Sequence, residues 1–177
     1  GWGVLADGGV SLDISRGLID SNMETALMIS GEGTDVTLRD VLVRDTRSSR
    51  EGLRGRGIQV QEQASLIAER LHVIRSHETG IFIIDDNTTF DASQLNISET
   101  KEASCAIQGT CEYLGGFGDG MVVLGGADVS LSDFSIKDNS RVGLFLASAD
   151  GTEFTSVSGM PTFEGEEGEI AENQYGV

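Results

Sequence analysis

The chain has 177 residues, of which 38% are hydrophobic, so it has the size of one domain and can bury a core of its own. Its 12 Lys and Arg against 29 Asp and Glu give a formal net charge of −17, which repels nucleic acid and anionic membranes and disfavours acidic glycans. The charge favours cations, neutral sugars or another protein as partners, although adaptation to a salt-rich habitat would explain it equally. No apolar run is long enough for a membrane span, so no membrane insertion is expected.

A repeat with a basic unit of 23 residues organises the chain. In most units a glycine stands just before an alternating apolar run. These runs begin at Val4, Leu27, Ile58, Ile81, Met121, Leu144 and Val177, at intervals of 23, 31, 23, 40, 23 and 33 residues. Alternation places the apolar side chains on one face of a strand. The unit that starts at Met121 predicts three short strands, 121–123, 129–131 and 134–136, with a bend between the last two.

The later apolar positions of each unit also align, four in every unit. The aligned sets are Leu12, Ile14, Gly17 and Ile19; Val36, Leu38, Val41 and Val43; Leu66, Ala68, Leu71 and Val73; Phe90, Ala92, Leu95 and Ile97; and Val129, Leu131, Phe134 and Ile136. Three residues beyond the last position of each set stands a small polar residue, namely Asn22, Thr46, Ser76, Thr100 and Asn139. If the units stack about 4.8 Å apart, these residues form a polar ladder at a turn.

Two repeat families fit part of this pattern. Residues 131–139, LSDFSIKDN, match the core of a leucine-rich repeat, but Arg141 stands where that repeat requires a leucine. The fuller pattern, G-I-x-I followed by V-x-L-x-x-F-x-I-x-x-N, resembles the repeat of pectate-lyase-like proteins from residue 3 to residue 177. The resemblance implies an all-β, right-handed parallel β-helix of about six coils, with residues 1–177 as one domain. It also implies a bacterial protein that is extracellular, on the cell surface or in the periplasm.

The two ends of the chain fall at the same phase of the repeat, WGV at residues 2–4 and YGV at residues 175–177. The end of a β-helix carries unpaired backbone groups and is normally covered by a cap. Neither end has the pattern of an amphipathic capping helix. We therefore expect a segment of a longer solenoid, with further coils at both ends; a partner that covers the ends is the alternative.

Three enlarged units are expected to insert loops at one edge of the solenoid, in residues 46–57, 100–120 and 163–176. Loops on a rigid scaffold commonly carry binding function, but they can also be tolerated surface insertions. The first loop contains four arginines, Arg47, Arg50, Arg54 and Arg56. Arginine suits an anionic ligand. Alternatively, the four pair with the acidic third loop, which contains Glu164, Glu166, Glu167 and Glu169.

The second loop holds both cysteines, Cys105 and Cys111. Five intervening residues, one of them a glycine, allow a disulfide, which would indicate an oxidising compartment. The disulfide would stiffen the loop near Tyr113 and Phe117, which we consider binding residues. A zinc site would need His72 and His77 as further ligands, and the spacing matches no common zinc motif.

Asp85 and Asp86 follow the apolar run 81–84 and are candidates for catalysis, with Arg75 as a possible base. Hydrolases of the resembled superfamily carry paired aspartates together with G-H-G and R-I-K motifs, which this chain lacks, and its lyases use aspartates for Ca²⁺ with an Arg or Lys base. A Ca²⁺ site would draw on Asp85, Asp86 or Asp150, but no D-x-D-x-D-G loop is present. The aspartate pair also fits a solvated turn, and no other cofactor is expected.

Taken together, the sequence favours a non-enzymatic module, secreted or on the cell surface, that binds a glycan or a protein through its edge loops. The alternative is a polysaccharide lyase or glycoside hydrolase of the resembled superfamily. The missing catalytic motifs and the scarcity of basic residues favour the binding module.

Overall fold

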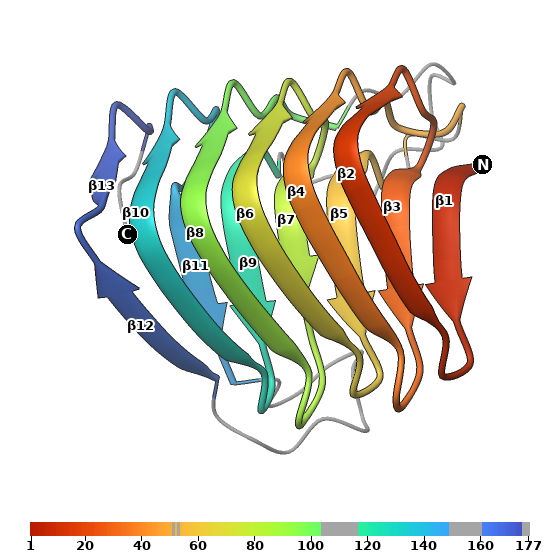
Figure 1. Cartoon of the computed structure of the whole chain (residues 1–177). Coiled ribbons are helices and arrows are strands. Elements are labelled where there is room, and N and C mark those ends of the chain that lie inside the picture. The colour runs from red at the N-terminus through yellow and green to blue at the C-terminus, as the bar shows by residue number, and fades with distance from the viewer. Residues whose placement is uncertain (51, 53, 104–116, 149–160, 175–177) are drawn as a thin grey trace.

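The structure, a computed structural model, describes residues 1–50, 52, 54–103, 117–148 and 161–174 (Figure 1). This part of the chain forms thirteen β-strands in two sheets, and all strand pairs are parallel. It contains no helix, and therefore none that could span a membrane. The chain passes back and forth between the two sheets, which face each other across a shared core.

Odd-numbered strands form the first sheet and even-numbered strands the second, with one exception at the end. The first sheet has the order β1 (Trp2–Asp7), β3 (Thr25–Ser30), β5 (Arg56–Gln61), β7 (Thr79–Ile83), β9 (Asp119–Leu124) and β11 (Leu144–Ala147). The second has the order β2 (Ser11–Asp20), β4 (Asp35–Arg44), β6 (Ser65–Ile74), β8 (Thr89–Ser98), β10 (Asp128–Lys137) and β12 (Thr162–Glu166). The short strand β13 (Glu169–Ala171) also pairs with β10, beyond the end of β12.

The strand register confirms the repeat. Val4 pairs with Leu27, Leu27 with Ile58, Ile58 with Ile81, Ile81 with Met121, and Met121 with Leu144. The aligned apolar sets of the second sheet also pair position by position from Leu12 through Val129. Each such row is a stack of apolar side chains that buries itself against the rows of the facing sheet.

Each of the first five units contains two strands in place of the three that we predicted, whereas in the last unit the bend separates β12 from β13. The expected second and third strands are one strand of ten residues with a bend in the middle, as in β10. The residue at each bend has a left-handed backbone, with φ between 51 and 56°. These bend residues are Arg16, Asp40, Arg70, Gln94, Asp133 and Glu167. At the bend, two successive side chains face outward. Beyond the bend, every second side chain again faces the core.

The third insertion does not lie where the sequence predicted it. Residues 162–171 form β12 and β13 and continue the second sheet, so they are not a loop. In sequence, the additional residues of this unit fall between the end of β11 and the start of β12, and residues 149–160 lie outside the described part of the chain. The prediction of a loop was wrong because the last unit lacks the usual apolar pattern: Gly165 and Gly168 stand where the other units have apolar residues. A Cβ at Gly168 would lie 2.1 Å from the ring of Phe134, which already fills that space.

The glycine before most of the apolar runs marks a close approach between layers, and Ala26 stands in its place before Leu27. A Cβ at Gly80 would lie 2.5 Å from the carbonyl oxygen of Gly120 and 2.6 Å from the side chain of Ile97. A Cβ at Gly120 would meet Ile136 and the carbonyl of Gly143 in the same way. Only glycine therefore fits at these positions, which explains why this signal recurs along the sequence.

We predict that the two faces of β6 respond differently to truncation. Leu71 is fully buried and its neighbour His72 is exposed. Leu71→Ala removes a core side chain and should lower the free energy of unfolding by about 2–5 kcal/mol. His72→Ala should change it by less than about 0.5 kcal/mol. Urea denaturation followed by circular dichroism measures both, and equal losses would contradict the alternation of faces.

Candidate functional site

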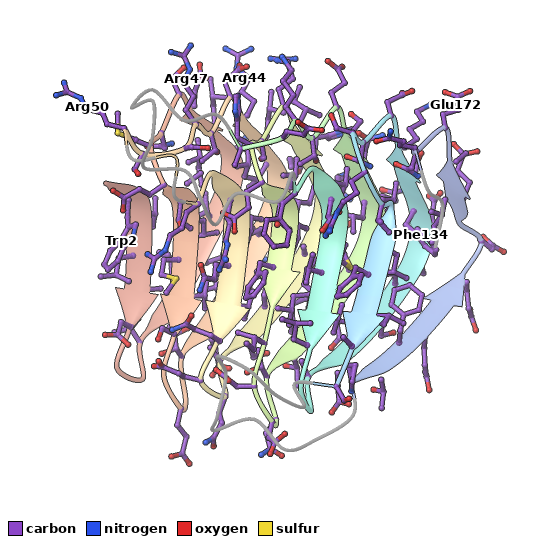
Figure 2. The ribbon with its side chains drawn as sticks, turned by 180° about the vertical axis from the view of Figure 1, so that it is seen from behind. Trp2, Arg44, Arg47, Arg50, Phe134 and Glu172 are labelled. Atoms are coloured by element: carbon purple, nitrogen blue, oxygen red, sulfur yellow. The ribbon has the colours of Figure 1, made fainter. Side chains whose placement is uncertain are left out.

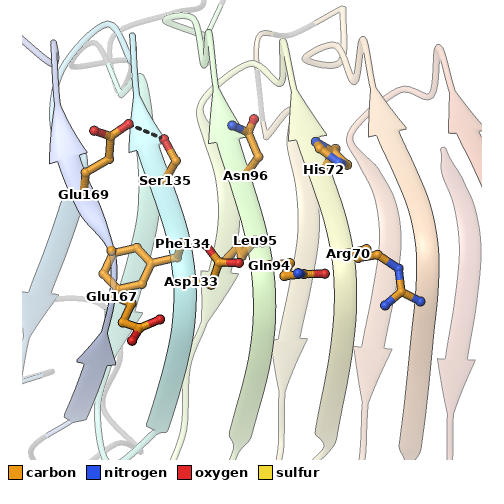
Figure 3. Close-up of a pocket in the computed structure, with 11 residues that line it drawn as sticks. Arg70, His72, Gln94, Leu95, Asn96, Asp133, Phe134, Ser135, Glu167 and Glu169 are labelled. Atoms are coloured by element: carbon orange, nitrogen blue, oxygen red, sulfur yellow. Dashed lines mark hydrogen bonds between the residues drawn. The ribbon is translucent and has the colours of Figure 1, made fainter.

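A groove with a volume of about 600 Å³ lies on the outer face of the second sheet (Figure 3). Strands β6, β8 and β10 and the segment from β12 to β13 each contribute two outward polar side chains. The pairs are Arg70 and His72, Gln94 and Asn96, Asp133 and Ser135, and Glu167 and Glu169. The first member of each pair is the left-handed bend residue, and the second follows two residues later. A ligand that runs across the strands would meet a new pair about every 4.8 Å.

The groove changes in charge from one end to the other. At the β6 end, Arg70 donates hydrogen bonds to Asp40 on β4, at 2.5 and 3.1 Å, and also pairs with Glu69. The guanidinium therefore extends away from the groove toward β4 (Figure 3). This contact lowers the pKa of Asp40 and raises that of Arg70. The two amide side chains in the middle are neutral.

At the other end the groove is acidic and partly apolar. Ser135 donates a hydrogen bond of 3.0 Å to Glu169 (Figure 3). Asp133 and Glu167 make no ion pair within the described part of the chain. The half-buried ring of Phe134 lines the same end, and it meets Phe163 edge to face at 6.2 Å between centroids. The arrangement offers hydrogen-bond donors, acceptors and one aromatic surface.

The groove was not predicted from the sequence. Of its lining residues, His72 was a zinc candidate, Leu95 and Phe134 were apolar repeat positions, and Glu167 and Glu169 belonged to the expected acidic loop. The outward residues of successive units differ in type and carry no periodic signal. A search for the residues that flank each bend would have found them, once the bend had been located.

Three of the four first-loop arginines, Arg47, Arg50 and Arg54, are exposed. Figure 2 shows Arg47 and Arg50 near the N-terminal strands and Glu172 at the far end of the stack. The expected pairing with the acidic third segment is therefore wrong, because β4 and β12 are separated by three intervening strands.

The fourth, Arg56, begins β5 and is largely buried. It donates a hydrogen bond of 2.9 Å to Glu78 and one of 3.0 Å to Gln59. Its guanidinium also lies 3.8 Å from the ring centroid of Phe82. Arg56 thus has a structural partner in Glu78 on the outer face of the first sheet, and not in the acidic segment.

Phe117 is exposed and contacts a second buried ion pair. Arg141 lies 4.8 Å from its ring centroid and donates a hydrogen bond of 2.7 Å to Asp119, which is fully buried. This contact raises the pKa of Arg141. The other candidates of the second loop, Cys105, Cys111 and Tyr113, lie outside the described residues, as does Asp150.

The structure does not bring the catalytic candidates together. Arg75 follows β6 at one edge of the sheets, whereas Asp85 and Asp86 follow β7 at the opposite edge (Figure 1). Asp85 accepts a hydrogen bond from the backbone of Glu62 at 3.0 Å, and Asp86 accepts one from Gly126 at 3.1 Å. These contacts tie adjacent turns together. Within the described ranges, no group of three or more His, Cys, Asp or Glu could hold a metal ion.

The polar-ladder residues stack at one turn of the fold, and Asn173 adds a further position. Asn139 donates to Asn173 from its backbone at 3.0 Å and from its side chain at 2.9 Å, and it accepts a bond from the backbone of Thr100 at 3.1 Å. Thr46 and Ser76 are buried, and their hydroxyls have no hydrogen-bond partner in the described part of the chain.

Comparison of the chain with protein-family models, with curated protein sequences and with solved structures finds no match to any of them.

We predict that the ion pair of Arg75 and Asp45 makes the stability of the fold depend on pH. Arg75 donates two hydrogen bonds of 2.8 Å to Asp45, and this contact lowers the pKa of the Asp45 carboxyl group. The stabilisation of the fold by this pair is complete above the usual pKa of an aspartate, about 3.9, and is lost as the pH falls through the lowered pKa. The wild type should therefore lose more thermal stability than Arg75→Gln between pH 6 and pH 2.

The measurement is the midpoint of thermal unfolding as a function of pH. Arg54→Gln, which removes an exposed arginine elsewhere, should retain the wild-type profile. The effect should be small because the pair lies at the surface. Identical profiles for Arg75→Gln and the wild type would contradict the assignment.

Proposed function

We propose that this chain is a β-helix module, secreted or displayed at the cell surface, that binds a linear glycan in the groove of the second sheet. The observation that carries the proposal is the set of paired polar side chains, which recurs on successive strands along a groove of about 600 Å³. Amides, hydroxyls and carboxylates are the groups that match the alternating donors and acceptors of sugar hydroxyls. Phe134 offers an apolar patch for the carbon face of a sugar ring.

The proposed scaffold is a right-handed parallel β-helix of about six coils, of the pectate-lyase-like kind. The passage of the chain between two parallel sheets supports this scaffold, since crossovers between parallel strands are right-handed in almost all proteins. Exposed loops of the chain, including Arg47, Arg50, Arg54 and Phe117, would extend the binding surface or contact a partner protein.

The proposed ligand is a neutral glycan. A net charge of −17, together with Asp133, Glu167 and Glu169 in the groove, opposes the binding of polymers of uronic acids. The amides of Gln94 and Asn96 lie at the centre, so we expect them to make the most fully desolvated contacts with the ligand.

The proposal predicts that the double variant Gln94→Ala and Asn96→Ala binds its glycan about tenfold more weakly, because each lost hydrogen bond contributes about 0.5–1.5 kcal/mol. Affinity electrophoresis against neutral polysaccharides such as β-glucan, xylan and galactomannan identifies the ligand and measures the change. Gln63→Ala is the matched control, since Gln63 also has a left-handed backbone, with φ of 65°, but lies in a turn outside the groove. No binding to any polysaccharide, or equal loss in the control, would contradict the proposal.

A hydrolase is the second candidate, and one observation favours it. Asp133 on β10 and Glu167 between β12 and β13 occupy the same bend position in neighbouring layers, and both line the groove. Two carboxyl groups on either side of a glycosidic bond are the usual catalytic pair of glycoside hydrolases.

This alternative predicts that the protein shortens a polysaccharide and that Asp133→Asn lowers the rate at least a hundredfold while the binding affinity is retained. Reducing-end release, with and without added Ca²⁺, measures hydrolysis, and absorbance of unsaturated products measures lyase activity. Asp91→Asn is the control, because Asp91 is an exposed aspartate of β8 outside this groove. Binding without cleavage would leave the binding module as the function.

A further inference from the structure

Positive charge is concentrated at one edge of this acidic protein. The even-numbered strands from β2 to β10 all end at this edge, where the chain crosses from the second sheet back to the first (top of Figure 1). These crossings carry half of the 12 Lys and Arg of the chain, although they make up a minor part of its length. The six are Arg47, Arg50, Arg54, Arg75, Lys101 and Arg141.

Three basic side chains occupy the same position in successive layers of this edge. Isolated bridges pair Met23 with Arg47 and His77 with Lys101. The backbone N–H of His77 donates a hydrogen bond of 3.0 Å to the carbonyl of Thr46, so the layer of Arg47 lies beside that of His77. Arg47, His77 and Lys101 therefore form one row, with about 4.8 Å between layers. We call these three residues the cationic row.

The neighbouring rows at this edge join opposite charges. Arg44 donates a hydrogen bond of 2.8 Å to Asp20, and Arg75 donates two of 2.8 Å to Asp45. Like charges at matching positions of neighbouring strands destabilise a sheet. The cationic row thus costs free energy of folding, and an anion bound across the row would offset this cost.

The cationic row is accessible to a small ligand. Arg47 and Lys101 are exposed, and His77 is half-buried in the layer between them (Figure 2 shows Arg47). Gly55 packs closely on His77, since a Cβ at Gly55 would lie 2.7 Å from the Cβ of His77. The Nδ1 atom of His77 is buried and has no hydrogen-bond partner in the described part of the chain. A guanidinium and an ammonium on either side of an imidazole are groups that bind sulfate and phosphate.

The surroundings of His77 disfavour its protonated form. Burial lowers the pKa of His77, and the positive charges of Lys101 and Arg47 lower it further. The backbone of Glu102 and the carboxylate of Asp45 act in the opposite direction and less strongly. An anion in contact with the row would reverse this balance, because an opposite charge nearby favours the charged form of a histidine.

The carboxylates near the row do not prevent an anion from binding. Asp45 is bound by Arg75, and Glu78 accepts a hydrogen bond of 2.9 Å from Arg56. Glu102 is exposed to solvent, which weakens its field. Charges farther away than about 8–10 Å are largely screened at physiological ionic strength. The net charge of −17 therefore has little effect on a small anion that is already at the row.

We propose that the cationic row binds the sulfate or phosphate group of a ligand, with Arg47 and Lys101 as its charged contacts and His77 between them. The row lies at the edge of the sheets, whereas the proposed glycan groove lies on the outer face of the second sheet. The inference is thus independent of the proposed function, and either can fail without the other. Because a bound dianion favours the protonated form of His77, binding should tighten as the pH falls.

NMR titration of the histidine rings tests this proposal, because His72 and His77 are the two histidines of the chain. The pH titration is recorded in sodium sulfate and in sodium chloride of the same ionic strength. Sulfate should raise the pKa of His77 by about 0.5–1. His72, which is exposed on β6, should titrate alike in both salts. An unchanged pKa of His77, or equal changes for both histidines, would overturn the proposal.

Variants that remove one charge locate the site. Arg47→Gln and Lys101→Gln should each weaken sulfate binding about two- to fivefold, as measured from the ring signals of His77. Arg16→Gln is the matched control, because it removes the same charge from an exposed arginine at the bend of β2, away from this edge. Equal weakening by all three variants would show a response to net charge alone, and would overturn the site.

The source of the anionic group is distinguished by two polymers. The ring signals of His77 are followed while dextran sulfate or polyphosphate is added. A response at lower concentrations of dextran sulfate would identify a sulfated glycan as the source, and the reverse order would identify a phosphorylated ligand. Either order supports the site.

Discussion

In-register pairing of parallel strands is the constraint from which the other features of this protein follow. Each row of the core is a column of side chains one strand spacing apart, for example Val36, Leu66 and Phe90. No single unit can bury its own apolar face, so each layer depends on the two beside it. The same constraint aligns the close-approach glycines, the bends and the polar ladder.

The bends convert this regular core into a varied surface. A left-handed backbone costs a residue other than glycine about 1–2 kcal/mol, yet polar residues such as Gln94 and Asp133 adopt it in every unit. The cost is offset because the strand turns while its inward residues remain in the core. Two successive outward side chains result at each bend, and these are free to differ from layer to layer. The groove is lined by one residue of this pair, the bend residue, and by the outward residue two positions later, so the types of these polar residues are not fixed by the core.

The contrast between a regular core and a varied outer surface explains which features could be predicted from the sequence. The apolar rows were predicted residue by residue, because burial on a strand imposes an alternation that a sequence reveals. The last unit was misread, since Gly165 and Gly168 break the pattern where the ring of Phe134 occupies the space. The pairing of the first-loop arginines was misassigned for the same reason, because it relied on a loop that is in fact β12 and β13. The groove could not be predicted, because Arg70, Gln94 and Asp133 share a backbone conformation but no chemical type.

The variation along the groove bears on how a ligand would be oriented. Asp40 and Glu69 both pair with Arg70, so its positive charge is compensated at the β6 end of the groove. Asp133 and Glu167 make no ion pair in the described part of the chain, and both line the groove at the end where Phe134 lies. A chain of identical neutral sugars would therefore meet a nonuniform field, and the sugar over Phe134 would experience both an apolar surface and strong acceptors. Carboxylates bind hydroxyl donors more strongly than amides do. The acidic end should thus anchor the ligand, while the amides of β8 set its register across the strands.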